Sequence, residues 1–123
     1  MISCSSGWAE TALVAEYTGT NEIIEADLVA GTQEVVLPAL GWVLDIAIDP
    51  QDQKLYWVEG PADIKRANLD GSGVEVVVGG YFFGVGQSGV ALDLNAGHLY
   101  WNDTDSLYRA NLDGSGAMMI PGP

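Results

Sequence analysis

The sequence has one cysteine and only four basic residues among its 123 residues. Because Cys4 has no second cysteine to pair with, the chain forms no internal disulfide framework. The 17 acidic residues give a formal net charge of −13 at pH 7. Such a surface repels nucleic-acid phosphates and anionic lipid, so neither nucleic acid nor a membrane surface is an expected partner.

Long hydrophobic runs are also missing. The longest apolar stretch, Val35–Ile48, contains Pro38 and Asp45 and is too short to span a bilayer, so no direct membrane insertion is expected. The first four residues and the Ser-Ser-Gly that follows them resemble the cleavage end of a bacterial lipoprotein signal. Lipoprotein anchoring at Cys4 is therefore one alternative, and an ordinary free thiol in an unstructured start is the other.

The chain has a single histidine, and its surroundings do not suggest catalysis. General acid–base or nucleophilic catalysis would require His98 to lie near a serine or cysteine and an orienting carboxylate. No nucleophile motif surrounds any serine. His98 begins an apolar segment at the position where an earlier copy of that segment has Lys54. We therefore expect an exposed strand-end residue there, and a chain that is not an enzyme.

Glycine and short apolar runs are abundant. Hydrophobic residues make up 48% of the chain, and 16 glycines separate short runs of Val, Ile, Leu, Tyr and Trp. This is not the composition of a disordered chain. It indicates an all-β fold with frequent tight turns.

The sequence repeats itself at shifts of 41 to 44 residues. Three segments recur in the same order: Ile46–Asp49 as Val90–Asp93, Leu55–Trp57 as Leu99–Trp101, and Ala67–Gly73 as Ala110–Gly116. A worn earlier copy precedes them, in which Ile23–Leu28 parallels Ile64–Leu69. That copy has lost the Asp-Gly-Ser-Gly turn and the aromatic pair, but it keeps the apolar pattern.

Each period divides into four short β-like runs. In the last copy these are Gly89–Leu94, His98–Asp103, Ser106–Leu112 and Ala117–Ile120. Asn- and Asp-Gly-containing turns join the runs, and Gly and Asn accept the positive φ that connections between antiparallel neighbours need. Every period is therefore predicted to form a four-stranded antiparallel meander.

The apolar runs also predict how the meanders pack. Leu99, Tyr100 and Trp101 follow one another directly, and consecutive side chains of a strand point to opposite faces of its sheet. These sheets must therefore be covered on both faces, and no segment has the length or periodicity of a covering helix. Repeated sheets of this kind can cover one another by radial stacking, which is the arrangement of a β-propeller.

The repeated motifs resemble a known family. Leu55–Glu59 and Leu99–Asp103 are similar to the Leu-Tyr-Trp-Thr-Asp core of the low-density lipoprotein receptor class B (YWTD) repeat family. Ile64–Gly71 and Leu107–Gly114 are similar to its Ile-x-x-x-x-Leu-Asp-Gly segment. The resemblance implies an all-β fold of about three four-stranded antiparallel blades of a YWTD-type β-propeller. This would be a partial ring, since the family's propellers have six blades when complete.

The expected blades are a degenerate blade 1 at about 8–40, blade 2 at about 43–80 and blade 3 at about 88–121. Blade 1 is expected to begin near its second strand, at about Thr11. An arc of three blades leaves apolar faces open, so self-association or further blades would be needed to complete the ring. The chain is then a fragment of a longer protein, half of a ring formed by two chains, or an open arc that associates.

The resemblance gives the most recognisable residues structural roles. It implies that Trp57 and Trp101 wedge between neighbouring blades, and that Asp103 accepts hydrogen bonds from backbone groups at the strand ends. It implies that Asp49 and Asp93 also accept hydrogen bonds from backbone groups, beside the inner strands. The other positions of the structural motif are Tyr56, Glu59, Asp70, Gly71, Tyr100, Asp113 and Gly114.

Two short segments resemble pieces of a calcium loop. Asp70–Gly73 and Asp113–Gly116 carry an aspartate followed by Gly-Ser-Gly, but they lack the further oxygen ligands and the closing Glu of a calcium loop. The same tetrapeptide makes a good hairpin turn, which is the expected role. No cofactor is expected; a calcium ion in the central channel, as in lactonase-type propellers, is the alternative.

The candidate ligand-binding residues are aromatic. Trp42 and the segment Tyr81, Phe82 and Phe83 each link the outer strand of one blade to the inner strand of the next, which places them at one end of the ring near the channel. Exposed aromatics there would anchor a partner, whereas packing between blades is the competing interpretation.

The expected function is that of a non-catalytic protein-binding or scaffold module of extracellular or cell-surface type. The expected partner is a protein or peptide, or a glycan, with basic patches suited to the acidic surface. The main alternative is a fragment of a calcium-dependent hydrolase or lactonase-like six-bladed propeller, and a third is a purely structural repeat array.

Overall fold

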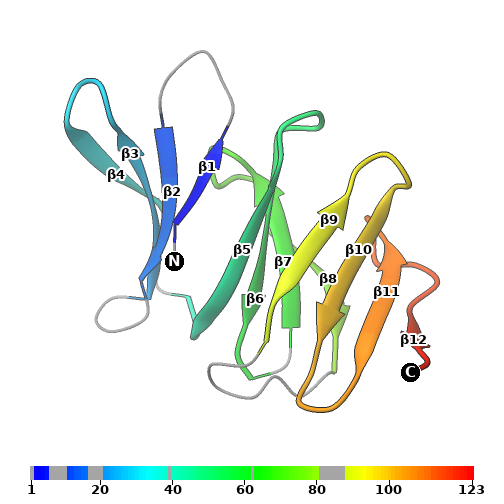
Figure 1. Ribbon diagram of the computed structural model, residues 1–123. Helices are drawn as coiled ribbons and strands as arrows, with labels where there is room; N and C mark the ends of the chain where they lie inside the picture. The colour runs from blue at the N-terminus through cyan, green and yellow to red at the C-terminus, as the bar shows by residue number, and fades with distance from the viewer. Residues whose placement is uncertain (1, 6–10, 17–20, 39, 62, 81–87) are drawn as a thin grey trace.

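A computed structural model of the chain describes residues 2–5, 11–16, 21–38, 40–61, 63–80 and 88–123, and side chains from residue 21 onward. Within these residues it contains twelve β-strands and no helix, arranged as three four-stranded antiparallel sheets (Figure 1). Each sheet is a meander whose strands pair in chain order. The predicted all-β fold of three blades is confirmed.

The strands of each blade follow the repeat. Blade 1 consists of β1 (Ile2–Ser5), β2 (Thr11–Glu16), β3 (Glu22–Asp27) and β4 (Thr32–Leu37). Blade 2 consists of β5 (Val43–Asp49), β6 (Lys54–Glu59), β7 (Asp63–Asn68) and β8 (Glu75–Gly79). Blade 3 consists of β9 (Val90–Asp93), β10 (His98–Asn102), β11 (Leu107–Asn111) and β12 (Met118–Ile120). The strands of blade 3 lie inside the four runs predicted for the last copy.

Blade 1 has an inner strand that the sequence did not reveal. β1 pairs antiparallel with β2, with Ile2 opposite Val14 and Ser5 opposite Thr11. The expectation that this blade begins near its second strand was therefore wrong, and the backbone of Cys4 belongs to a strand rather than to an unstructured start. The sequence Ile-Ser-Cys-Ser lacks the apolar run and the closing aspartate that mark the inner strands of the other blades, so nothing in the repeat pointed to it.

The three blades lie side by side around their inner strands. β5 packs beside β1 on one side and beside β9 on the other (Figure 1). In each blade the second strand pairs with the inner strand, the third strand pairs with the second, and the fourth strand lies outermost. This is the radial arrangement that apolar sheets without helices were expected to adopt.

Strand β6 shows why the blades need one another. Leu55, Tyr56, Trp57 and Val58 are consecutive, and none is more than 1% exposed. Leu55 and Trp57 belong to a cluster with residues of blade 1, whereas Tyr56 and Val58 belong to a cluster with residues of blade 3. The strand alternation of period two therefore distributes one apolar run between two neighbours.

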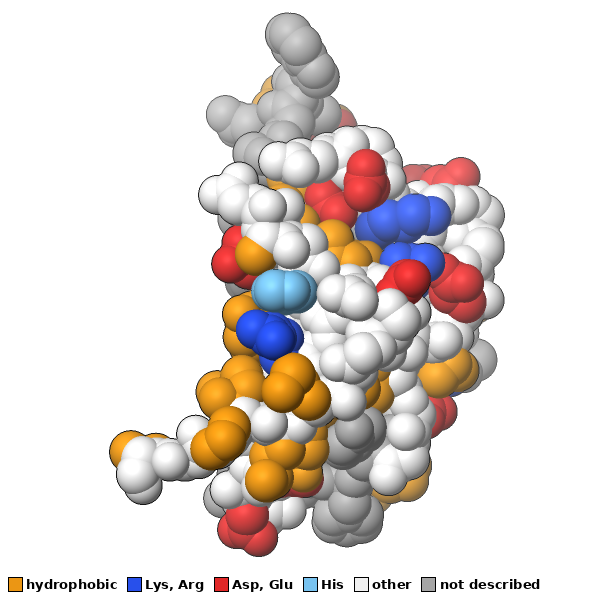
Figure 2. Space-filling model, turned by 90° about the vertical axis from the view of Figure 1, so that its right-hand side faces the viewer, with side chains coloured by type: hydrophobic (Ala, Val, Ile, Leu, Met, Phe, Trp, Pro, Cys, Tyr) orange, Lys and Arg blue, Asp and Glu red, His pale blue; other side chains and the backbone are white. Residues whose placement is uncertain are grey.

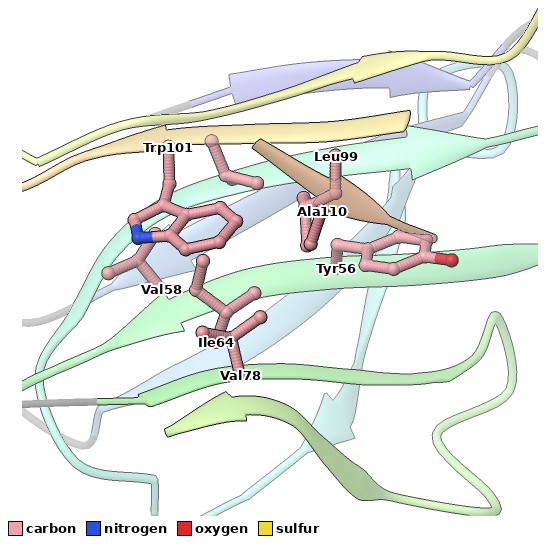
Figure 3. Packing of buried hydrophobic residues seen from close by; sticks show 8 residues of the cluster. Tyr56, Val58, Ile64, Val78, Leu99, Trp101 and Ala110 are labelled. Atoms are coloured by element: carbon pink, nitrogen blue, oxygen red, sulfur yellow. The ribbon is translucent and has the colours of Figure 1, made fainter. Parts of the chain in front are cut away.

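The two clusters are the hydrophobic cores of the molecule. The first core lies between blades 1 and 2 and contains Ile23, Leu37, Val43, Ile46, Leu55, Trp57 and Ala67. The second core lies between blades 2 and 3 and contains Tyr56, Val58, Ile64, Val78, Val90, Leu99, Trp101 and Ala110. Figure 3 shows Trp101 of blade 3 reaching toward Val58 and Ile64 of blade 2. Each buried tryptophan thus lies between two blades, as the resemblance implied.

Two glycines allow the turn of one blade to lie against the preceding blade. Gly71 has φ of +86°, and a Cβ atom built on it would lie 2.2 Å from the carbonyl oxygen of Val36 in β4. Gly114 has φ of +88°, and its Cβ would lie 1.9 Å from the carbonyl oxygen of Val77 in β8. Only glycine fits both the backbone conformation and the close approach. The repeated Asp-Gly turn is therefore part of the interface between blades.

Candidate binding face

Trp42 lies at the end of the blades where the inner strand β5 begins, and it is 55% exposed. Its base is held in place, because its carbonyl oxygen accepts a hydrogen bond from the Gly60 nitrogen at 2.7 Å. A Cβ built on Gly60 would lie 3.5 Å from the Trp42 Cβ and 3.6 Å from its Cε3. The indole therefore rests with one edge on the loop after β6 and presents much of its surface to solvent.

A buried network supports the segment that carries Trp42. Glu59 accepts a hydrogen bond from the Gly41 nitrogen at 2.8 Å through one carboxylate oxygen, and one from the Trp57 indole nitrogen at 2.9 Å through the other. The Lys65 ammonium lies 3.2 Å from the latter oxygen. Burial alone would raise the pKa of Glu59, but the hydrogen bonds from Trp57, Gly41 and Lys65 outweigh burial, and the pKa lies below its ordinary value.

A second network at the same end ties the inner strands of blades 2 and 3 together. One carboxylate oxygen of Asp45 accepts a hydrogen bond from the Val90 nitrogen at 2.8 Å, across the blade boundary. The Gly89 nitrogen donates to the Asn102 side chain at 2.9 Å. The sequence analysis missed Asp45, because the repeat has Gly89 at the matching position and so gave no sign that a carboxylate is needed there.

Asp103 holds the turn at the end of β10. Its Oδ1 accepts hydrogen bonds from the backbone nitrogens of Asp105 and Ser106, and its Oδ2 accepts one from the Tyr108 hydroxyl at 2.9 Å. The bond from Asp105 is the main reason that the pKa of Asp103 lies below its ordinary value. The Tyr108 ring stacks on Trp101, with centroids 5.5 Å apart. Asp103 therefore fixes a strand end and the aromatic stack beside it.

The aspartates at the opposite end of the blades cap turns. Asp49 accepts hydrogen bonds from the nitrogens of Gln51 and Asp52, and Asp93 accepts one from Ala96. Asp70 and Asp113 each accept hydrogen bonds from the hydroxyl and the nitrogen of the serine two residues later, and these bonds lower the pKa of both carboxyls. In the described part of the chain, no group of three or more His, Cys, Asp or Glu side chains is placed to hold a metal ion.

The remaining candidates fall in different places. His98 begins β10, is half-buried, and meets the Tyr100 ring edge-on at 6.2 Å between centroids. Lys54 begins β6 at the matching position and donates to Asn68. Tyr81, Phe82 and Phe83 lie outside the described residues. Trp42 is thus the one member of the aromatic set whose surroundings can be stated.

One cross-blade contact was not anticipated. The Tyr56 hydroxyl and the Arg66 Nη1 both donate to the carbonyl oxygen of Leu112, at 3.3 Å and 3.1 Å. Leu112 belongs to the turn after β11, so two side chains of blade 2 form hydrogen bonds with the Leu-Asp-Gly turn of blade 3. A signal existed in the sequence, because the tyrosine and the arginine both recur one repeat later, at Tyr100 and Arg109.

The fold and the repeat can be compared with those of known proteins. A chain in the crystal structure of a nidogen–laminin complex superposes with a TM-score of 0.81 at 21% identity, covering 96% of this chain and 45% of that chain. The human low-density lipoprotein receptor-related protein 5-like protein is 35% identical over 113 residues, covering 86% of this chain and 43% of that protein. The chain carries repeats of the low-density lipoprotein receptor class B (YWTD) kind.

Other comparisons mark the extent of this assignment. The vitellogenin receptor of Solenopsis invicta is 32% identical over 72 residues, which are 58% of this YWTD chain and 4% of the receptor. The chain therefore spans less than half the length of both relatives. TolB from Acinetobacter baumannii superposes with a TM-score of 0.70 at 14% identity, covering 93% of this chain and 29% of that chain, which is a likeness of fold alone. No family model matches the sequence.

Proposed function

We propose that this YWTD chain is a non-catalytic module of an extracellular or cell-surface protein. It binds a protein or peptide partner at the end of the blades where Trp42 lies. The observation that carries the proposal is the setting of Trp42, which is 55% exposed although its backbone and the preceding Gly41 are hydrogen-bonded to the buried framework. An aromatic side chain on a rigid base offers apolar contact area at a low entropic cost, which is typical of the anchors of protein interfaces.

The acidic residues of the repeat motif support a non-catalytic role. Asp49, Asp70, Asp93, Asp103 and Asp113 accept hydrogen bonds from backbone groups of their own turns, and Glu59 is paired with Lys65 and Trp57. Carboxylates used in this way are poor general bases, because their lone pairs are engaged and several of their pKa values are lowered.

The names of the relatives support a binding role on a cell surface. Two are receptors or receptor-related proteins, and one of the matching solved structures is that of a nidogen–laminin complex. Within the described residues, no helix is long and apolar enough to cross a membrane. The net charge of −13 favours a partner with a basic patch, because the field of an acidic domain attracts such a partner from a distance.

The binding proposal predicts a specific effect of Trp42→Ala. Peptides selected from a displayed library against the chain should bind the variant at least about tenfold more weakly, or about 1.4 kcal/mol. The melting temperature should stay within about 3 °C of the wild type, since an exposed side chain contributes little to the core. Fluorescence titration gives the affinities, and thermal melts give the stability.

Val74→Ala is the matched control, because it removes another exposed apolar side chain, 50% exposed, in the turn after β7. Equal binding by the wild type and the Trp42 variant would contradict the proposed site. A glycan array probed with the same two variants separates a sugar ligand from a peptide. Tight calcium binding together with ester hydrolysis would contradict the non-catalytic role.

A further inference from the structure

The outer part of blade 1 carries an open hollow lined by polar side chains of β3 and β4. Its volume is about 310 Å³. This is close to the lower limit of the roughly 300–1,000 Å³ that ligand pockets span, so the hollow suits one side chain rather than a large ligand. The residues that line it are Glu25, Asp27, Thr32, Gln33 and Glu34.

The hollow lies on the side of blade 1 that faces blade 2. Ile23, Glu25 and Asp27 alternate along β3, so their side chains share one face of the sheet. Ile23 is buried on this face, in the first core between the two blades. Glu34 of β4 lies directly opposite Glu25. The hollow therefore borders a boundary whose two blades both belong to this chain.

Blade 2 shows what the equivalent position binds. Arg66 and Glu75 are the residues one repeat after Glu25 and Glu34, and they lie opposite each other in the same register. The Arg66 guanidinium forms an ion pair with Glu75 through Nε, and its Nη1 donates to the Leu112 carbonyl at 3.1 Å. The carboxylate at this position of the outer strand is therefore the partner of a guanidinium in blade 2.

Blade 1 has no such cation of its own. Glu25 replaces the arginine, so two carboxylates face each other across the strands, which is unfavourable. Residues 1–42 contain six acidic residues and no lysine or arginine. The four basic residues lie in blades 2 and 3 and contact groups of those two blades. Figure 2, which shows the blade 3 side of the molecule, has Lys and Arg side chains beside acidic ones. A cation that balances Glu25 and Glu34 therefore comes from another molecule.

The arrangement favours an organic cation over a metal ion. No group of three or more His, Cys, Asp or Glu side chains in the described ranges is placed to hold a metal. Asp27 is engaged with its own turn, because its Oδ1 accepts hydrogen bonds from the Val29 and Ala30 nitrogens at 2.9 Å. Glu25 and Glu34 remain as two facing carboxylates. A guanidinium has N–H donors on several sides of a plane and can bridge two such groups, whereas an ammonium is a compact point charge.

We propose that the hollow of blade 1 binds an arginine side chain of a protein partner. The guanidinium of the partner donates to Glu34, as that of Arg66 donates to Glu75 in blade 2. It also donates to Glu25, which stands where blade 2 has its arginine. The degenerate blade thus takes from a partner the cation that the next blade supplies from its own sequence.

This site is separate from the face that carries Trp42. The Leu40 nitrogen donates to the Asn21 carbonyl, so β3 begins beside the segment of Trp42. From there β3 runs toward the opposite end of the blade, where Asp27 and the hollow lie. An arginine in the hollow is therefore a contact additional to the one proposed for Trp42.

The test titrates the full chain, labelled for nuclear magnetic resonance, with a blocked Gly-Arg-Gly-Arg-Gly peptide. The amide resonances of β3 and β4 around the hollow should shift as the peptide binds. Glu25→Gln combined with Glu34→Gln should weaken binding at these amides at least about tenfold, because both charge-assisted hydrogen bonds lose their acceptor charge. The same peptide with citrulline, a neutral analogue of arginine, should cause no shift there.

The matched control is Asp52→Asn combined with Asp105→Asn, which removes two exposed carboxylates elsewhere and changes the net charge equally. It should bind the peptide within about twofold of the wild type, since distant exposed charges are screened by salt. Equal weakening by the two double variants would show attraction by net charge alone and would overturn the site. Equal binding of a lysine peptide would overturn the selection of a guanidinium. The same shifts caused by calcium chloride without peptide would also contradict the inference.

Glu25→Arg tests the equivalence of the two blades directly. The new arginine should pair with Glu34 inside the chain, so peptide binding at the hollow should be lost. The melting temperature should rise by about 1–4 °C, because an ion pair replaces two facing carboxylates. Asp105→Arg changes the charge equally and should bind as the wild type does. Retained binding by Glu25→Arg, or a lower melting temperature, would contradict the proposal. The readout at β3 and β4 is independent of the peptide selection that tests Trp42, so either proposal can fail alone.

Discussion

The first core and the second core are built from apolar side chains at equivalent positions of the repeat, but the polar contacts described around them differ. In both, a tryptophan from the second strand of one blade enters the boundary with the preceding blade, as Trp57 does in the first core and Trp101 in the second. The second core is also crossed by directional bonds from Tyr56 and Arg66 to Leu112 and from Val90 to Asp45. At the boundary between blades 2 and 3, directional bonds therefore add to the apolar contacts.

The degenerate blade shows which part of the repeat tolerates change. Blade 1 has Glu25 at the position of Arg66, opposite Leu13 rather than a tyrosine. A carboxylate has no proton to donate at neutral pH, so Glu25 cannot replace the hydrogen bond that Arg66 donates to a turn carbonyl of the next blade. It nevertheless keeps Ile23 and Leu37 buried in the first core. Blade 1 therefore keeps the apolar positions of the repeat but lacks the tyrosine and arginine that donate hydrogen bonds to the next blade.

The largest effect is expected from removing a buried tryptophan. Trp101→Ala should lower the free energy of unfolding by about 3–5 kcal/mol, because it leaves a large cavity between two blades. Trp57→Ala should lower the free energy of unfolding by about 1 kcal/mol more than Trp101→Ala does, since it also removes a hydrogen bond to Glu59. Urea denaturation measures both. Trp42→Ala is the control at an exposed site, and a loss below about 1 kcal/mol for either buried tryptophan would contradict the wedge role.

A smaller effect is expected at the turn that enters the second core. Gly114→Ala should cost about 2–4 kcal/mol, because its Cβ would meet the Val77 carbonyl at 1.9 Å and its φ is +88°. Gly97→Ala is the matched control, with φ of +72° and no atom within 4 Å of the added Cβ. It should cost only the conformational term, about 1–2 kcal/mol. Equal losses in thermal or urea unfolding would show that the turn does not pack closely.

The smallest effect concerns Glu59 and depends on pH. Because the folded-state pKa of Glu59 is lowered, its contribution to stability is present above the pKa of the unfolded chain and is lost as the pH falls through the folded value. Glu59→Gln should cost about 1–2 kcal/mol at pH 7, and the difference from wild type should shrink in acid. Glu34→Gln, at an exposed position of β4, is the control. A difference that is constant with pH would contradict this role of the carboxylate.

The fold could be predicted from the repeat because each run of consecutive apolar residues indicates that both faces of its sheet are buried. Leu99, Tyr100 and Trp101 required cover on two sides, and the register of the second and third strands followed from that pattern. The strand Ile2–Ser5 could not be predicted, since its alternating small polar residues carry no such demand. The contact of Asp45 was also beyond prediction, because it depends on which amide the next blade brings within reach. The recurrence of Tyr56 and Arg66 one repeat later was a signal in the sequence, but it did not identify the carbonyl that accepts their hydrogen bonds.

Strand β6 also determines how the molecule comes apart. Its four consecutive buried residues serve two cores at once, so melting of blade 2 strips a face from each of its neighbours. When this chain is studied on its own, blades 1 and 3 each share one of the two cores with blade 2, and either can separate at the expense of a single boundary. Unfolding should therefore begin at the ends and become concerted once it reaches the middle, with blade 2 the last to acquire solvent-exposed amides.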